Sequence, residues 1–110
     1  MQYCLTIQLK DNPELIKEYE KYHQAGQVWP EVIKSIRDSG ILNMSIYRLN
    51  TQLIMIIDVD KTFDFNAKVR DDLNNPKVQE WEMLMEKYQL IDNKNKWKVI
   101  NRIFSLAEQK

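Results

Sequence analysis

The side chains best suited to proton transfer lie in one short stretch, residues 17–31. This stretch holds the only histidine of the chain, His23, and Tyr19 stands four residues before it. On a helix, residues four apart project from the same face, so a proton carrier would lie beside a phenol. Imidazole exchanges protons near neutral pH because its unperturbed pKa is about 6.5. The pair therefore indicates acid–base chemistry, although a lone histidine on a helix that faces a sheet is more often structural than catalytic.

The composition excludes several classes of partner. Sixteen basic and sixteen acidic residues cancel, so no excess of positive charge is present to neutralise a phosphate backbone or an anionic membrane surface. A helix needs about 20 consecutive apolar residues to cross a bilayer, and no segment approaches this length. At the amino terminus, no basic region precedes a long apolar stretch. We expect no nucleic acid and no membrane as partner, and a cytoplasmic location.

The residues that hold metals and nucleotides are too few for such sites. One histidine and one cysteine, Cys4, fall in different predicted elements, which leaves no paired spacing for zinc or iron. The only glycines, Gly26 and Gly40, cannot make a glycine-rich phosphate loop. Cys4 lies in an apolar run, so we interpret it as a buried core thiol and not as a nucleophile. The sequence predicts no metal and no cofactor.

Hydrophobic periodicity and helix signals predict the elements that must position His23 and Tyr19. A capping residue and a proline at Asn12-Pro13 begin the helix that carries both, and Pro30 opens the next helix after a break at residues 24–27. In the first half, the predicted elements are a strand at 2–9, a helix from Asn12 to Tyr22 or His23, and a helix from Pro30 to Gly40. Two strands at 41–49 and 52–59 follow and pair as a hairpin. The remaining elements are helices at 63–73 and 78–90, a polar loop at 92–96, and a strand at 97–106.

The element order β-α-β-β-α-β predicts an α+β fold of the ferredoxin-like, split βαβ type in one domain spanning residues 1–110. Its four-stranded antiparallel sheet would carry helices on one face. Residues 53–57 are nearly continuous in apolar side chains, so the second face of the sheet also needs a cover. A homodimer whose sheets face each other, a dimeric α+β barrel, would supply it.

Four short motifs, in this order, resemble the L-rhamnose mutarotases and the related L-fucose mutarotase-like proteins. They are Tyr19-x-x-x-His23, Trp29-Pro30-Glu31, Gly40-x-x-Asn43-x-x-Ile46-Tyr47 and Gln79-Glu80-Trp81. The resemblance covers nearly the whole chain in element order and implies the same dimeric α+β barrel. It also implies a cofactor-independent isomerase that interconverts the α and β anomers of a 6-deoxy-L-sugar such as L-rhamnose or L-fucose.

The resemblance implies roles for individual residues. His23 matches the proton donor, Tyr19 matches a tyrosine that contacts the sugar, and Trp81 matches a tryptophan that lines the pocket. Where the family has a tyrosine and a second tryptophan this chain has Met44 and Glu82, so a sugar with differently placed hydroxyls is expected there. The gap between His23 and Trp29 is also longer than in the rhamnose enzymes.

Trp29 and Glu31 complete the predicted substrate-binding set, and each has a simpler explanation. Trp29 would pack at the junction of two helices. Glu31 in the first turn of a helix faces the positive end of the helix dipole, which accounts for it without a function. Trp81 lies on an apolar helical stripe and would be a core residue by default, while its flat ring could also support the C–H face of a sugar.

Two other functions fit the same architecture. One is a cofactor-free oxygenase, which would want a deep apolar cavity, whereas Glu82 beside Tyr19 and His23 makes this site polar. The other is a non-catalytic dimeric barrel that binds a small polar ligand or a partner protein. This second alternative would gain support if the longer segment near Ala25 and Gly26 moved His23 out of the pocket.

Overall fold

The protein is an antiparallel sheet with helices packed on one side, described by a computed structural model over residues 1–90 and 97–109. The elements are β1 (Gln2–Leu9), α1 (Pro13–Tyr22), α2 (Pro30–Asp38), β2 (Ile41–Leu49), β3 (Gln52–Val59), α3 (Phe65–Leu73), α4 (Pro76–Glu86), β4 (Gln89–Leu90), β5 (Lys98–Ile100) and a short 3₁₀ helix (Leu106–Glu108). The strand order is β2-β3-β1-β4, and β5 also pairs with β1. The predicted α+β class and antiparallel sheet are confirmed, but the sheet has five strands within the described residues in place of the predicted four, because β4 and β5 both pair with β1.

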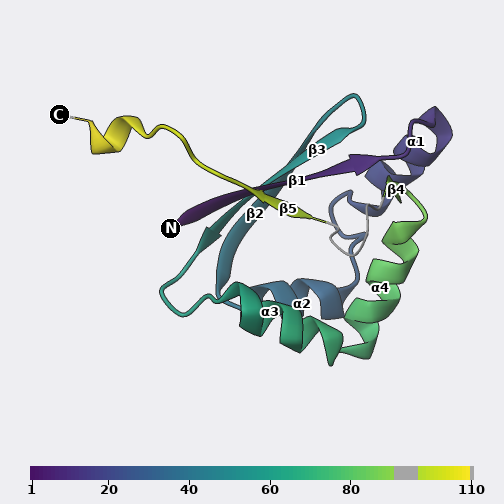
Figure 1. Cartoon of the computed structure of the whole chain (residues 1–110). Coiled ribbons are helices and arrows are strands. Elements are labelled where there is room, and N and C mark those ends of the chain that lie inside the picture. The colour runs from purple at the N-terminus through teal and green to yellow at the C-terminus, as the bar shows by residue number, and fades with distance from the viewer. Residues whose placement is uncertain (91–96, 110) are drawn as a thin grey trace.

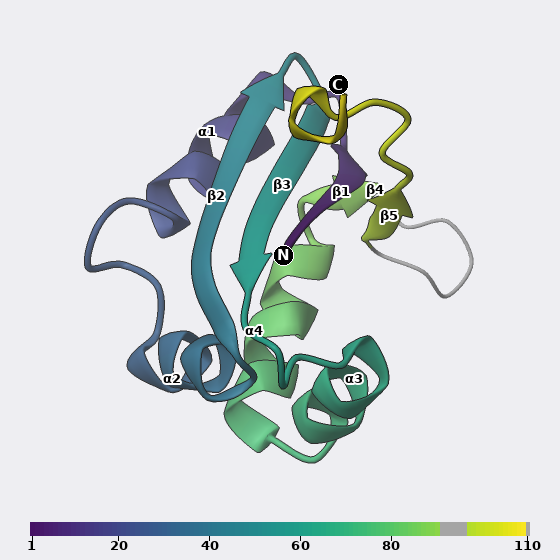
Figure 2. The same cartoon turned by 90° about the vertical axis from the view of Figure 1, so that its left-hand side faces the viewer.

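The arrangement in space leaves one face of the sheet open. In Figure 1 the helices α2, α3 and α4 surround one side of the sheet. Figure 2 looks onto the other side, and there β2 and β3 lie in front of α1 and α4. The segment after β5 leaves the sheet and projects away from the helices (Figure 1).

Local signals in the sequence fix where the first two helices begin and end. The Asn12 side chain accepts hydrogen bonds from the backbone N–H groups of Glu14 (3.0 Å) and Leu15 (3.2 Å), which caps α1. Pro30 is the first residue of α2, as predicted. The predicted break at 24–27 is present as a series of turns and a bend. Gly40 follows α2 with a φ of +96°, a conformation that glycine adopts without a Cβ penalty.

The alternation along β1 and β3 builds the core. The most buried hydrophobic side chains are Leu5, Ile7 and Leu9 from β1, Ile41 from β2, Leu53, Ile57 and Val59 from β3, and Tyr19, Val32, Val78, Trp81, Met85 and Tyr88 from α1, α2, α4 and the turn before β4. Each strand side chain of this set lies on the helix side of the sheet, because neighbours along a strand point to opposite faces. Ile54 and Ile56 point the other way and are half-buried. The cover predicted for that face, a second copy of the chain, stays a prediction.

The carboxyl-terminal third differs from the predicted elements. The helix predicted over 78–90 ends at Glu86, and Gln89–Leu90 instead form β4, which pairs with Gln8 and Leu9. The strand predicted over 97–106 is limited to Lys98–Ile100, and the helix predicted from residue 63 begins at Phe65. Long-range pairing with β1 causes the first difference, since the backbone N–H of Lys10 also donates to the carbonyl of Tyr88 at 2.9 Å. The predicted loop at 92–96 lies outside the described residues.

Candidate functional site

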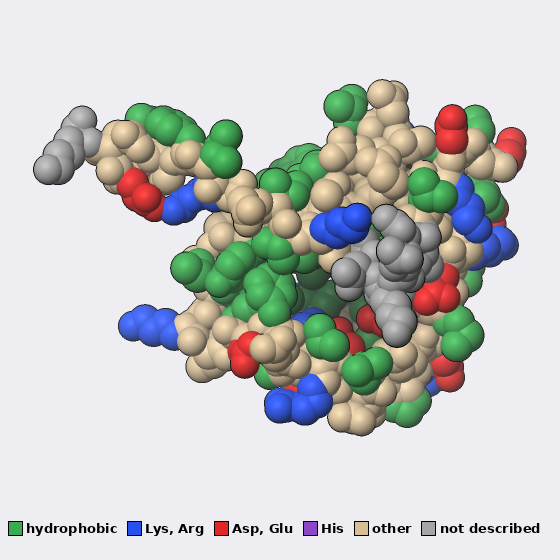
Figure 3. Space-filling model, in the orientation of Figure 1, with side chains coloured by type: hydrophobic (Ala, Val, Ile, Leu, Met, Phe, Trp, Pro, Cys, Tyr) green, Lys and Arg blue, Asp and Glu red, His purple; other side chains and the backbone are tan. Residues whose placement is uncertain are grey.

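A cavity of about 610 Å³ lies between the sheet and the helices. Its wall includes Tyr19 and His23 at the end of α1, Met44 from β2, Lys68 and Asp72 from α3, Trp81 and Glu82 from α4, Gln89 from β4, and Trp97. The space-filling view in Figure 3 is hollowed between β5 and α3, and acidic and basic side chains are visible inside the hollow. The cavity is large enough for a monosaccharide, and its wall is apolar with a few polar groups, as small-molecule sites usually are.

His23 is held in a single orientation at the carboxyl end of α1. Its Nδ1 donates a hydrogen bond to the carbonyl oxygen of Tyr19, at 2.7 Å. A carbonyl can only accept, so Nδ1 carries the hydrogen and Nε2 is the nitrogen that can accept a proton. Burial lowers the pKa of His23 below 6.5, and the bond to the Tyr19 carbonyl opposes that shift. At neutral pH His23 is therefore a neutral imidazole with a basic Nε2.

Tyr19 stands directly against this imidazole. The two rings are stacked, with centroids 4.3 Å apart and planes inclined by 26°. Only 3% of Tyr19 is exposed. Burial raises the pKa of Tyr19 to about 12, although a hydrogen bond from the Gln89 side chain opposes this. The phenol therefore keeps its proton at neutral pH and is a hydrogen-bond donor.

Trp81 forms an aromatic wall next to the histidine. Its ring meets the His23 ring edge to face at 5.6 Å between centroids. Trp29 packs edge to face on the same indole at 5.3 Å. Trp29 is not among the described residues that line the cavity, so its contact with the site runs through Trp81. This fits the packing role that the sequence left open for Trp29.

The α3 side of the cavity is charged. Lys68 and Asp72 form an ion pair of 2.6 Å, and their side chains are only 16% and 18% exposed. Glu82 lines the cavity nearby and accepts a hydrogen bond from Gln79 at 3.3 Å. Such groups suit a ligand rich in hydroxyls, because each hydroxyl can both donate to a carboxylate and accept from an ammonium group.

The structure brings together most of the residues predicted from the sequence, but not all of them. Tyr19, His23, Met44, Trp81 and Glu82 all line the cavity. The turns between His23 and α2 thus leave His23 in the wall of the pocket.

Two predicted substrate-binding residues, Trp29 and Glu31, do not line the cavity. Trp29 reaches the site through Trp81, whereas Glu31 has no such contact among the described residues. It is exposed in the first turn of α2 and does not line the cavity. The contact with the helix dipole therefore accounts for this residue, and the structure does not bring it to the other site residues.

Sequence reasoning missed several polar residues of the cavity wall, among them Lys68, Asp72 and Gln89. Lys68 and Asp72 are four apart in a predicted helix, a spacing that usually marks an exposed ion pair. Nothing in the local sequence indicated that α3 would turn this pair toward the cavity. Gln89 was missed because it fell within the helix predicted over residues 78–90.

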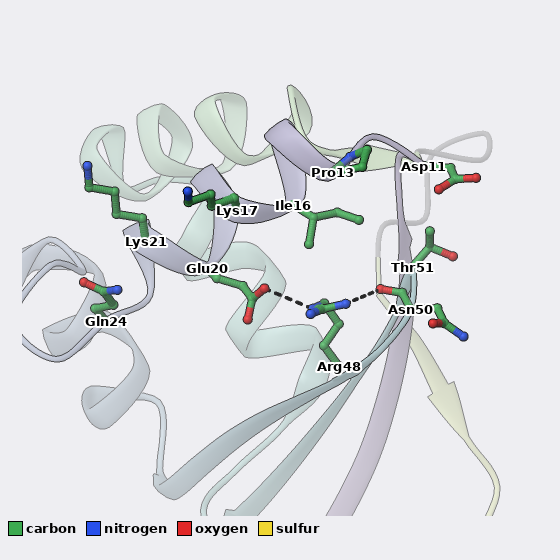
Figure 4. A pocket seen from close by; sticks show the side chains of 10 residues that line it. All are labelled: Asp11, Pro13, Ile16, Lys17, Glu20, Lys21, Gln24, Arg48, Asn50 and Thr51. Atoms are coloured by element: carbon green, nitrogen blue, oxygen red, sulfur yellow. Dashed lines mark hydrogen bonds and ion pairs between the residues drawn. The ribbon is translucent and has the colours of Figure 1, made fainter.

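A second hollow, of about 780 Å³, lies between α1 and the turn that joins β2 to β3 (Figure 4). Arg48 crosses it, donating to Glu20 at 3.1 Å and to the carbonyl of Asn50 at 2.8 Å. The described residues that line it include no histidine, tyrosine or tryptophan. It is a polar surface groove without the acid–base pair, so we assign the candidate site to the first cavity.

Two kinds of feature are absent from residues 1–90 and 97–109. No helix in this part of the chain combines the length and apolar character needed to cross a membrane. Nor do these residues contain a group of three or more histidine, cysteine or carboxylate side chains placed to hold a metal ion.

Comparisons with known proteins point to one family. A family model described as L-rhamnose mutarotase matches residues 2–106. The L-fucose mutarotase of Xanthomonas campestris pv. campestris is 36% identical over 109 residues, covering 96% of this chain and 87% of that protein. A UPF0734 protein of Dictyostelium discoideum is also 36% identical, over 88 residues that cover 79% of this chain and 69% of that protein.

Two solved structures share the fold. The crystal structure of an L-rhamnose mutarotase from Formosa agariphila has a TM-score of 0.72 and 19% identity, covering 96% of this chain and 98% of that one. Tetracenomycin F2 cyclase from Streptomyces glaucescens, a type-II polyketide cyclase, has a TM-score of 0.62 and 10% identity over 96% and 95% of the two chains. At these identities the likeness concerns the fold alone.

Proposed function

This chain belongs to the L-rhamnose mutarotase family, and we propose that it interconverts the α and β anomers of a 6-deoxy-L-sugar such as L-rhamnose or L-fucose. The enzyme class is that of an isomerase, and the proposed reaction needs no cofactor. Within the proposal, His23 is the acid–base residue and Tyr19 its hydrogen-bonding partner. The observation that carries the proposal is the stacked Tyr19–His23 pair in the wall of a cavity that fits a monosaccharide.

Anomer exchange requires one proton to leave the anomeric hydroxyl and one to reach the ring oxygen, so that the ring opens to an aldehyde. Both oxygens are bonded to the same carbon, so a single nitrogen can serve both. In the proposed mechanism, Nε2 of the neutral His23 takes the proton from the hydroxyl and returns it to the ring oxygen as the C–O bond breaks. The aldehyde rotates, and the reverse transfers close the ring on the other face.

Tyr19 complements this transfer as a hydrogen-bond donor. Its raised pKa keeps the O–H intact, so it donates to the sugar oxygen on which negative charge grows. A positioned acid–base group typically accelerates a reaction by about 10²- to 10⁴-fold. This range is adequate for anomer exchange, which already proceeds slowly in water.

The rest of the cavity supports a sugar as the ligand. The Trp81 ring offers a flat apolar surface to the C–H face of the ring. Lys68, Asp72 and Glu82 lie on the α3 side and can bind hydroxyls, while Met44 is an apolar contact where the family has a tyrosine. We propose Trp81, Glu82 and Met44 as substrate-binding residues and do not include Glu31.

We also propose that the chain acts as a homodimer and, as the sequence indicated, in the cytoplasm. The open sheet face carries Ile54 and Ile56, which no described helix covers. The projecting terminal segment is apolar as well, since Ile103 is 98% exposed and Leu106 is 76% exposed. Apolar surface of this extent on a small protein favours a second copy as its cover. Light scattering coupled to gel filtration tests this, and a monomer at micromolar concentration would contradict it.

The function is tested by saturation-transfer NMR, which measures anomer exchange at equilibrium on L-rhamnose and L-fucose. We expect the protein to accelerate exchange of at least one of these sugars. His23→Ala should lower the rate of anomer exchange by about 10²-fold or more. Tyr19→Phe should lower it by about 10- to 100-fold, because it removes a hydrogen bond to a charged oxygen. Tyr47→Phe is the matched control, because Tyr47 is 60% exposed and does not line the cavity.

Circular dichroism must confirm that each variant is folded. Full exchange in a folded His23→Ala variant would remove His23 from the mechanism. No acceleration of either sugar by the wild type would favour a non-catalytic barrel that binds a small polar ligand.

A further inference from the structure

Gln89 is the only polar residue among the buried side chains of the described chain, with 4% of it exposed. Its Oε1 has no hydrogen-bond partner in residues 1–90 and 97–109. Most buried acceptors in folded proteins are paired, since an unpaired one has lost its hydration without gaining a partner. Gln89 lines the cavity and its Oε1 is shielded from solvent, so a small turn of the amide toward the cavity would give this oxygen a hydrogen-bond partner in the molecule that fills it.

The backbone around Gln89 is fixed on both sides. Gln89 pairs with Leu9 of β1 in the antiparallel register. Tyr88, just before it, is 1% exposed, and its carbonyl accepts from Lys10 at 2.9 Å. The side chain of Gln89 lines the same cavity as Tyr19, His23 and Trp81. Because the strand cannot shift easily, the side-chain amide of Gln89 is held at this wall.

The amide nitrogen of Gln89 already has a hydrogen-bond partner. The Gln89 side chain hydrogen-bonds to Tyr19 and lowers the pKa of that phenol, so the amide N–H donates and the phenol oxygen accepts. The phenol O–H stays available to donate into the cavity, and Oε1 of Gln89 stays available to accept. The wall thus presents a donor and an acceptor side by side, which is the pattern that two neighbouring sugar oxygens complement.

We propose that Gln89 is a substrate-binding and specificity-determining residue, whose Oε1 accepts a hydrogen bond from a sugar hydroxyl adjacent to the oxygen that Tyr19 contacts. Its N–H group at the same time orients the Tyr19 phenol. The inference rests on the proposed function and extends it. A neutral amide cannot transfer a proton, so Gln89 binds and positions while His23 exchanges protons. A site built this way rejects a sugar that lacks the hydroxyl, because Oε1 would again be buried without a partner.

The test replaces Gln89 with methionine, which has a similar length and no acceptor oxygen. Gln8→Met is the control, because Gln8 is exposed on β1 and does not line the cavity. Sugar binding is followed by intrinsic tryptophan fluorescence with L-rhamnose and L-fucose, since Trp81 and Trp97 line the cavity. Anomer exchange is followed by saturation-transfer NMR on the same samples, and the melting temperature is recorded without sugar.

We expect Gln89→Met to bind the sugar about 10- to 100-fold more weakly and to lose exchange to at least the same degree. Its melting temperature should fall by only about 4 °C, because the variant loses the one hydrogen bond from the amide to Tyr19, while Oε1 has no partner in the protein to lose. Gln8→Met should match the wild type in all three measurements. Gln89→Glu is measured beside Gln89→Met as a second variant.

Gln89→Glu keeps acceptor oxygens but no longer donates to Tyr19 and accepts the phenol proton instead. It should bind sugar within a few-fold of the wild type and lose mainly kcat. A purely structural role for Gln89 would not separate kcat from KM in this way.

The outcomes separate this inference from the proposed function. Unchanged binding and exchange in Gln89→Met would overturn the inference alone. A fall in melting temperature above about 10 °C would also overturn it, by assigning Oε1 to the fold. If the wild type binds a sugar without accelerating its exchange, and Gln89→Met weakens that binding, the proposed function fails and the inference stands. No binding of either sugar by the wild type would overturn the assignment of Gln89 to a sugar.

Discussion

Gly40 lies at the junction of α2 and β2, and the structure allows an estimate of the stability that a Gly40→Ala substitution would cost. The φ of Gly40 is +96°, and a Cβ added there would lie 2.6 Å from Oδ1 of Asp60 and 3.1 Å from Oγ1 of Thr62. Asp60 cannot move aside easily, since this Oδ1 accepts from the backbone N–H of Thr62 at 2.9 Å and from its hydroxyl at 2.7 Å. Gly40→Ala must therefore strain the backbone and disturb this turn.

The two effects can be estimated separately. A non-glycine residue in the left-handed region costs about 1–2 kcal/mol. Displacing the Asp60 carboxylate from Thr62 adds about 1–2 kcal/mol for its weakened hydrogen bonds. The sum of about 2–4 kcal/mol corresponds to a fall in melting temperature of about 8–16 °C for a domain of this size.

Gly26→Ala is the matched control for this estimate. Gly26 has a φ of +82°, but nothing lies within 4 Å of the added Cβ. The Gly26→Ala variant should lose only the stability that backbone strain costs, about 1–2 kcal/mol, which lowers the melting temperature by about 4–8 °C. Thermal unfolding followed by circular dichroism measures both variants. Equal losses in the two variants, or a loss below about 3 °C for Gly40→Ala, would refute the reasoning from the Asp60 contact.

The remaining predictions concern the titratable and charged residues of the cavity wall. Because burial lowers the pKa of His23, its neutral form persists to lower pH than that of a free imidazole, so the acid-side fall in kcat/KM for anomer exchange should have its midpoint below pH 6.5. The same shift means that the unfolded chain binds the proton more tightly, so stability from His23 falls as pH drops below 6.5. A His23→Ala variant should lose less stability than the wild type between pH 7.5 and 5, and a larger loss would contradict the sign. Lys68→Met should destabilise by about 1–3 kcal/mol, because it leaves the Asp72 carboxylate half-buried without its cation. Urea titration measures the free energy of unfolding of this variant and of its control, Lys34→Met. The control breaks the exposed pair with Asp38 and should lose at most about 0.5 kcal/mol of stability.

Local sequence signals were sufficient for the first two thirds of the fold. The cap at Asn12, the prolines at 13 and 30, and the glycine at 40 act within a few residues of themselves, so their effects are visible in the sequence. The hairpin of β2 and β3 has the same character, since only a short turn at Asn50 separates two strand-like runs that pair with each other. The four-residue spacing of Tyr19 and His23 likewise placed the two side chains on one face of α1.

Long-range contacts decided what the sequence could not. Tyr88, Gln89 and Leu90 continue a helical pattern, yet they pair with β1 because the edge of β1 offers backbone groups that a longer α4 would leave unpaired. Lys68 and Asp72 have the spacing of a surface pair, and only the packing of α3 turns them toward the cavity. By itself, then, the sequence determined the α+β architecture, which follows from the order of its elements, and the Tyr19–His23 pair, which follows from spacing along one helix. The cavity, its charged side and the unpaired oxygen of Gln89 exist only where α1, α3, α4 and β4 converge, and tertiary structure alone decides how separate elements meet.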